Sequence, residues 1–351
     1  MNTVGDSAQL ASSIIDSIRH GQIEPGSFLP TVRQLSETHS VAHNTAWRAL
    51  KALARQGYVE AEPRKGFRVV GNGIPGIKPI AYVMSRENVF GGWDLLYRNL
   101  LTCFEQQAIR KQSYVVKLLM NAGEEHGILN HLKNNSLSGL VIDNPNLKLL
   151  KWAESNSLPA VVIDDWREDL NCDVVVQDNF AGGQLAVRHL LNKGCRRIAW
   201  FGLTLHHYHG QLRYSGSRTV ITAAGKTFAS ERFLKIDDAG LLQAAMELLS
   251  RADRPDGILA LWRPMTFAIA KAAQRLGLKI GSDLHVVGWI NEEAMQEGYF
   301  PLFEEGNVPP AVVWNAADMA EVAMSALPLR HADPKRPPVC HQVPVRLWQP
   351  T

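Results

Sequence analysis

Polar and basic side chains that can contact nucleic acid gather on one predicted helix near the start of the chain. Residues 42–56 place their apolar positions at helical spacing on a single face. The opposite face carries His43, Asn44, Trp47, Arg48 and Lys51. Short polar groups at a helix N-terminus can hydrogen-bond base edges in the major groove of DNA, and cations beside them can neutralise phosphates. The pattern therefore predicts a DNA-recognition helix.

The neighbouring segments supply the elements that must position this helix. An apolar stripe over residues 10–18 predicts a first helix, and Thr31 is a candidate N-cap for a short second one. Residues 58–61 and 67–70 alternate like two strands joined by a turn. This hairpin carries three cations, Arg64, Lys65 and Arg68. The order predicts a winged helix-turn-helix domain over residues 1–70, whose wing contacts phosphates.

Three separated segments of this region resemble the GntR-type winged helix in order and spacing. They are residues 25–36, 41–50 and 65–69. The resemblance implies that Arg33 contacts DNA from the second helix, and that further contacts come from the recognition helix. Those contacts fall on His43, Asn44, Thr45 and Arg48. Trp47 is equally compatible with DNA contact and with packing against the wing. The expected partner is a double-stranded DNA operator.

The length and net charge of the chain limit what its remaining residues can be. Its 351 residues exceed one ordinary domain, and a net charge of +3 makes basic groups informative only where they cluster. A Gly/Pro-rich tract at 71–79 predicts a linker to a second domain at 80–351. The sequence has neither a signal-peptide pattern nor an apolar run of membrane length, so we expect a cytoplasmic protein without a membrane partner.

Strand-like apolar runs alternate with helical patterns after residue 80. They lie at residues 80–84, 114–119, 139–143, 160–164, 173–176, 197–202, 257–261 and 285–288. Continuous apolar strands separated by helices predict an α/β fold with parallel sheets covered on both faces. Because one open sheet does not need so many units, we expect two lobes, with a ligand cleft at the carboxyl ends of the strands.

Residues 175–199, 213–225 and 255–289 resemble the effector domain of the LacI/GalR family, which is similar to periplasmic sugar-binding proteins. A GntR-type head on a LacI-type body is the arrangement of AraR-like regulators. The resemblance implies a homodimeric, sequence-specific transcriptional regulator, expected to be a repressor. A small-molecule effector would control it from between the two lobes of a periplasmic-binding-protein-like domain.

The same resemblance places the effector near six residues of the second half. They are Arg213, Trp262, Arg263, Trp289, Asn291 and Trp314. Asp143 and Asp164 follow predicted strands and add carboxylates at the presumed cleft. Tryptophan faces suit a sugar, whereas Arg213 and Arg263 favour an anion. We expect a sugar or an anionic sugar derivative. The alternative is a degenerate pocket, which would leave a ligand-independent DNA-binding regulator.

Other kinds of chemistry find no support in the sequence. It contains no P-loop, no glycine pattern for a dinucleotide after a first strand and no nucleophile elbow, so we expect neither an enzyme nor a cofactor. The four cysteines are scattered and are interpreted as reduced thiols. Histidines crowd residues 206–209, but adjacent side chains point apart and no other ligand lies at suitable spacing, so no metal site is predicted.

Overall fold

The computed structural model describes most of the chain. The described residues are 3–19, 22–24, 26–55, 58–62, 65–69, 79–85, 94–111, 113–121, 123–133, 135, 137–143, 145–203, 205, 207–234, 240–303 and 307–350. Arg64, His206 and residues 71–78 of the predicted linker lie outside them. The chain divides into two compact units, the first holding residues 1–82, 108–118 and 122–140.

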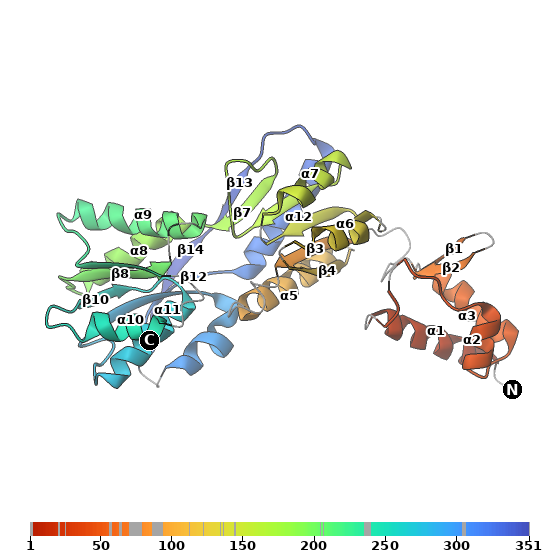
Figure 1. Ribbon diagram of the computed structural model, residues 1–351, viewed down its shortest axis with the longest axis horizontal. Helices are drawn as coiled ribbons and strands as arrows, with labels where there is room; N and C mark the ends of the chain where they lie inside the picture. The colour runs from red at the N-terminus through yellow and green to blue at the C-terminus, as the bar shows by residue number, and fades with distance from the viewer. Residues whose placement is uncertain are drawn as a thin grey trace. The chain divides into compact units, whose positions relative to one another are not determined.

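The amino-terminal domain has the predicted helices and hairpin. Its elements are α1 (Thr3–Arg19), α2 (Val32–Thr38), α3 (His43–Arg55), β1 (Val59–Glu62) and β2 (Gly66–Val69), at the red end of the chain in Figure 1. The Thr31 hydroxyl accepts from the Gln34 amide at 3.3 Å, and the Gln34 side chain accepts from the Thr31 amide at 2.9 Å. This capping box confirms Thr31 as the N-cap of α2.

The wing is the predicted two-stranded hairpin, and the segment before α2 adds an isolated β-bridge to it. β1 pairs antiparallel with β2, and the segment before α2 pairs with the other edge of β2 through a bridge from Phe28 to Arg68. The Leu29 amide donates to the Phe67 carbonyl, and the Val69 amide donates to the Ser27 carbonyl, both at 2.8 Å. β2 therefore has backbone hydrogen bonds on both of its edges.

The rest of the chain alternates strands and helices, as predicted. The elements are β3 (Ile80–Ser85), α5 (Asp94–Arg110), β4 (Val115–Met120), α6 (Glu125–Lys133), β5 (Gly139–Ile142), α7 (Leu147–Ser155), β6 (Ala160–Ile163), β7 (Asp173–Gln177), α8 (Asn179–Asn192), β8 (Ile198–Leu203), α9 (Tyr208–Ala223), β9 (Ser230–Leu234), α10 (Leu241–Leu249), β10 (Gly257–Leu259), α11 (Arg263–Arg275), β11 (His285–Asn291), η1 (Glu292–Ala294), η2 (Met295–Tyr299), η3 (Phe300–Leu302), β12 (Ala311–Trp314), α12 (Ala316–Ala332), β13 (Cys340–Val343) and β14 (Val345–Trp348).

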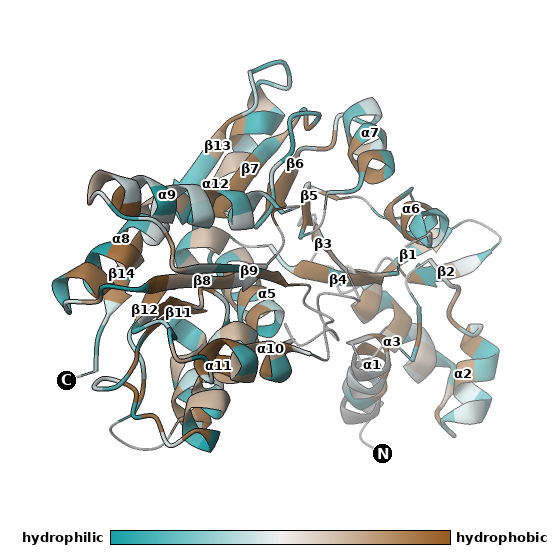
Figure 2. Ribbon diagram, turned by 60° about the vertical axis from the view of Figure 1, so that its left-hand side comes forward, coloured by the Kyte–Doolittle hydropathy of each residue, from teal (hydrophilic) through white to brown (hydrophobic). Residues whose placement is uncertain are grey.

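These strands form two sheets, as expected for two lobes. The first has the order β13-β7-β6-β5-β3-β4, and the second β14-β12-β11-β10-β8-β9. Neighbouring strands from β8 to β12 in the second sheet are parallel, while β14 is antiparallel to β12. Helices α8 and α9 cover one face of the second sheet, and α10 and α11 the other (Figure 1). Hydrophobic residues run along the strands of both sheets (Figure 2).

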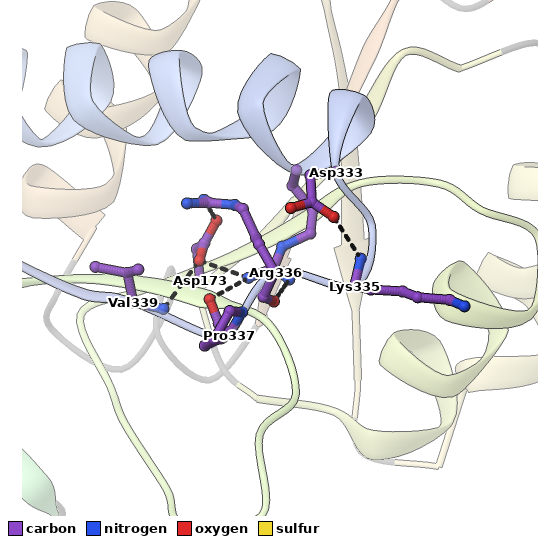
Figure 3. Close-up of polar contacts among 7 residues, drawn as sticks. Asp173, Asp333, Lys335, Arg336, Pro337 and Val339 are labelled. Carbon is purple, nitrogen blue, oxygen red and sulfur yellow. Dashed lines mark hydrogen bonds and ion pairs between the residues drawn. The ribbon is translucent and has the colours of Figure 1, made fainter.

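The chain changes sheet three times among the described elements: between β7 and β8, between β12 and β13, and between β13 and β14. A buried carboxylate stabilises the second of these crossings, between β12 and β13. Asp173, at the start of β7, accepts from Arg330 at 2.7 Å, from the Val339 amide at 3.0 Å and from Arg336 (Figure 3). Asp173 is fully buried, so its charge depends on these partners. The cluster holds β13 in register with β7.

Two glycines let α8 and α9 approach closely. A Cβ on Gly216 would lie 2.1 Å from the Phe180 carbonyl oxygen, and one on Gly183 would lie 2.2 Å from the Arg213 carbonyl oxygen. These obstacles are backbone atoms, which cannot turn away as a flexible side chain can. The close contact brings the middle of α9 against the start of α8, where polar residues of the cavity described below meet.

We expect Gly216→Ala to destabilise the protein by about 1–3 kcal/mol, because the new methyl group must push α8 and α9 apart. Urea unfolding followed by circular dichroism measures the loss. Gly127→Ala is the matched control, since Gly127 also lies in a helix but has open space at its Cβ. That variant should be neutral or more stable by up to about 1 kcal/mol. Equal stabilities of the two variants would contradict the close contact.

Candidate functional site

The exposed face of α3 presents the predicted DNA-contacting residues. His43, Asn44, Arg48 and Lys51 are exposed, while the core of the domain buries Ala46, Ala49, Leu50 and Leu53 on the other side. Among the described residues, Arg48 and Lys51 form no ion pair with a carboxylate, so their charges face solvent. This face can offer both base-reading groups and phosphate-binding cations.

Thr45 is an exception among the predicted contacts, because its side chain is buried in the head. The residue is only 4% exposed. It lies one helical turn before Ala49, which is fully buried, so both belong to the core side of α3. The hydroxyl of Thr45 is therefore not available to a groove in this conformation.

Trp47 joins the recognition helix to the wing. Its ring packs edge-on against Phe67 of β2, with centroids 5.7 Å apart, and the Lys51 ammonium lies 5.1 Å from its centroid. The side chain is nevertheless 42% exposed. The contact with Phe67 is the wing packing that the sequence left open for Trp47.

The other predicted cations of the head that the structure describes have acidic partners. Arg33 pairs with Glu37 at 3.0 Å on the exposed side of α2. In the wing, Lys65 pairs with Glu62 at 3.2 Å, and Arg68 pairs with Glu62 at 2.6 Å. Hydrogen bonds first from Arg68 and then from Lys65 lower the pKa of Glu62. The wing is therefore less basic than its cations alone suggest.

A cavity of about 140 Å³ gathers all eight predicted effector residues, and every residue that lines it belongs to the second unit. Its walls are Leu95, Leu96, Tyr97, Asp143, Asp164, Asp165, Gln177, His207, His209, Arg213, Trp262, Arg263, Trp289, Ile290, Asn291, Ala294 and Trp314. Strand ends of the first sheet supply Asp143, Asp164 and Gln177. Residues at the carboxyl ends of β10, β11 and β12 face them, as in other open parallel sheets.

Arg213 stands at the centre of this cavity with its guanidinium fixed on three sides. Nε donates to Asn179 at 2.8 Å, Nη1 to the Leu261 carbonyl at 2.7 Å and Nη2 to Gln177 at 3.1 Å. The guanidinium also stacks on aromatic rings. Its Cζ lies 3.8 Å from the Trp289 centroid and 4.9 Å from that of Trp262. Burial lowers the pKa of Arg213 to about 9, and the charge of Asp164 opposes the shift.

Asp164 is held beside Arg213 through Gln177. The Gln177 amide donates to Asp164 at 2.6 Å, while its carbonyl accepts from Arg213, so its orientation is defined by both neighbours. Burial raises the pKa of Asp164 to about 6, against the Gln177 hydrogen bond and the Arg213 charge. Its φ of +65° lies in the left-handed region that aspartate tolerates better than most residues.

Several lining residues escaped the sequence analysis. Gln177 ends a buried strand, and its role emerges only from its contacts with Asp164 and Arg213. His207 and His209 were considered only as metal ligands, although their rings stack at 5.4 Å. Burial, followed by the Arg213 charge, lowers the pKa of His209 well below its usual value. Among the described residues no group of three or more potential metal ligands occurs.

Comparisons with known proteins agree with both parts of this description. Residues 6–69 match the family described as bacterial regulatory proteins, gntR family, and residues 187–349 match the periplasmic binding protein-like domain. The chain joins a GntR-family head to a periplasmic-binding-protein-like domain. The second match begins well inside the expected 80–351 domain, so the boundaries at 70 and 80 stay predictions.

Individual relatives and solved structures are similar to much of the chain. The arabinose metabolism transcriptional repressor of Geobacillus stearothermophilus is 23% identical over 306 residues, covering 80% of each chain. The lac repressor dimer bound to operator and the anti-inducer ONPF has a TM-score of 0.63 at 18% identity, covering 78% of this chain and 93% of that chain. A LacI family regulator from Enterococcus faecium with bound ribose also has a TM-score of 0.63, at 18% identity, covering 77% and 97%. These structures establish the fold of the periplasmic-binding-protein-like domain. No helix among the described residues has the length and apolarity of a membrane span.

Asp164 should give the domain a measurable pH dependence. A carboxyl whose pKa is raised by folding binds its proton more tightly when folded, so its contribution to stability falls as pH rises from about 4 to about 6. Asp164→Asn removes that ionisation. Relative to wild type, the variant should gain stability across this range, by at most about 3 kcal/mol. Urea unfolding of both proteins at several pH values tests this, and parallel pH profiles would contradict the shifted pKa.

Proposed function

We propose that this chain is a sequence-specific transcriptional repressor, and that a small molecule bound in the Arg213 cavity controls its affinity for operator DNA. The observation that supports it most is that all eight effector residues predicted from the sequence line one cavity, in a chain whose residues 6–69 match the GntR family. The printed functions of the relatives support it. One represses arabinose metabolism, one is described bound to an operator, and one contains ribose.

The cavity is suited to link ligand binding to domain geometry. Carboxylates from the first sheet face tryptophans and an asparagine from the second across the same space. A ligand that bonds to both sets stabilises one arrangement of the two sheets over others, and the three chain crossings transmit that preference. Such coupling typically changes DNA affinity by 1–3 kcal/mol, which is enough to release or retain an operator. We propose that the repressor acts as a cytoplasmic homodimer.

We infer that, of the two effector classes that the sequence left open, the effector is a neutral sugar and not an anionic sugar derivative. Three carboxylates line the cavity against two arginines. Arg213 already donates to three protein acceptors and stacks on two indoles, which leaves at most two of its five N–H groups for a ligand. Hydroxyl groups can donate to Asp143 and Asp164 and accept from Arg213, while a sugar ring packs on indole.

Thermal unfolding across neutral sugars, sugar acids and sugar phosphates tests the effector class, because a ligand that binds only the folded state raises the midpoint. A neutral pentose or hexose should give the largest shift. A shift with acids or phosphates alone would restore the anionic assignment. The absence of any shift, with operator binding intact, would favour the ligand-independent regulator.

Asp143→Asn should weaken binding of the effector found in that panel by about tenfold or more, since a charge-assisted hydrogen bond contributes about 1.5–3 kcal/mol. Operator affinity without effector should stay within twofold of wild type. Asp169→Asn is the control, since Asp169 is a surface carboxylate paired with Arg167 outside the cavity. Titration calorimetry measures the effector, and unchanged affinity in Asp143→Asn would remove that carboxylate from the site.

Arg48→Ala should weaken operator binding by about 1–3 kcal/mol, because Arg48 is an exposed cation on the recognition helix. The operator is first selected by the wild-type protein from random duplexes, and anisotropy then gives the affinities. Arg275→Ala removes an exposed arginine from α11 and serves as the control for charge. An Arg48→Ala variant that binds as tightly as the Arg275→Ala variant would place Arg48 outside the interface.

A further inference from the structure

Glu62 occupies an unusual place on a surface that is proposed to face DNA. Its two carboxylate oxygens hold two different cations: Oε1 lies 2.6 Å from Nε of Arg68, and Oε2 lies 3.2 Å from Nζ of Lys65. Glu60, on the same face of β1, adds a contact of 3.2 Å to Arg68. Two wing cations that the sequence assigned to phosphates therefore have carboxylate partners within the wing.

The fold fixes Arg68 in this arrangement. Arg68 lies directly opposite Glu60 in the register of β1 and β2, and Phe28 bridges to it from the other side. Its side chain is only 26% exposed, against 68% for Lys65. A residue that pairs with β1 on one side and with a β-bridge on the other, and whose side chain is only 26% exposed, cannot extend toward a phosphate as a cation at a free loop tip can.

The net formal charge also differs between the wing and the two helices of the head. In the described wing residues 58–62 and 65–69, Glu60 and Glu62 cancel Lys65 and Arg68, which leaves no net charge. Residues 32–55, which contain α2 and α3, carry four arginines and lysines against a single glutamate, a net charge of +3. The electrostatic attraction for DNA therefore belongs to the helices and not to the described part of the wing.

Building on the DNA-binding function proposed above, we propose that Glu62 is a specificity-determining residue that suppresses sequence-independent binding by the wing. Phosphate contacts add affinity for every sequence, whereas base contacts from α3 add it for the operator alone. Pairing Lys65 and Arg68 with carboxylates lowers the first contribution and leaves the second, so the ratio of specific to non-specific affinity rises. Glu62 matters most because it holds both cations.

The deciding experiment compares wild-type protein with Glu62→Gln on a duplex of scrambled sequence, over about 50 to 200 mM salt. Glutamine keeps the shape and one acceptor oxygen but removes the charge that holds Lys65 and Arg68. We expect about 3- to 10-fold tighter binding, and a slope of log affinity against log salt steeper by about 1, the value for one additional phosphate contact. Affinity for the selected operator should rise less, so specificity falls.

Asp253→Asn is the matched control, because Asp253 also forms an exposed pair, with Arg251 at 2.7 Å, in the periplasmic-binding-protein-like domain. It changes the net charge of the chain by the same amount and should leave the salt slope unchanged. Adding Lys65→Gln to Glu62→Gln should remove most of the gain, since the released Lys65 is the more exposed of the two cations.

Each outcome has one meaning. Unchanged affinity and slope in Glu62→Gln would overturn the proposal, as would an equal effect of Asp253→Asn. Weaker binding of Glu62→Gln would also overturn it, and would instead make Glu62 a contact to a base, such as the amino group of cytosine. If the wild-type protein bound neither scrambled nor selected DNA at low salt, the DNA-binding function itself would fail.

Discussion

The cavity depends on the hydrogen bonds that the guanidinium of Arg213 donates to the surrounding elements. The guanidinium joins the end of β7 through Gln177, the start of α8 through Asn179 and the segment after β10 through the Leu261 carbonyl. These elements belong to both sheets and to the first of the three crossings between them. A buried cation needs such partners, because an unpaired charge in this position would cost several kcal/mol. The site is therefore organised around the hydrogen-bond acceptors that the buried Arg213 side chain requires.

The close approach of α8 and α9 makes this network possible. Because Gly183 and Gly216 have no Cβ, the backbones of the two helices meet closely, and Arg213 on α9 reaches Asn179 at the start of α8. The indoles of Trp262 and Trp289 then cover the guanidinium, which strengthens its hydrogen bonds by excluding water. What remains for a ligand is a space with aromatic walls and carboxylates on the opposite side, in which Arg213 acts more as a support than as the main anion receptor.

The amino-terminal domain arranges its charges differently. Its recognition helix keeps exposed cations on one face and a dry core on the other, whereas its wing pairs basic and acidic side chains within one small sheet. Trp47 connects the two by packing on Phe67, so the position of the wing relative to α3 is set by an apolar contact and not by charge. DNA recognition and effector recognition thus use opposite arrangements, with free cations in the head and a bound cation in the cavity.

The sequence by itself determined the order of elements and the chemistry of both sites. Helical periodicity, the N-cap at Thr31 and the apolar strands are local properties, and the residues of the cavity fall at strand ends that any parallel α/β sheet brings together. Only the tertiary structure decided the partners. The bridge from Phe28 to β2, the Glu62 contacts and the role of Gln177 join residues through pairings that no local pattern encodes, and the fixed orientation of Arg213 supports the proposal of a neutral ligand. Thr45 is an intermediate case: the family resemblance assigned it to DNA contact, although its spacing from the buried Ala49 is that of one helical turn.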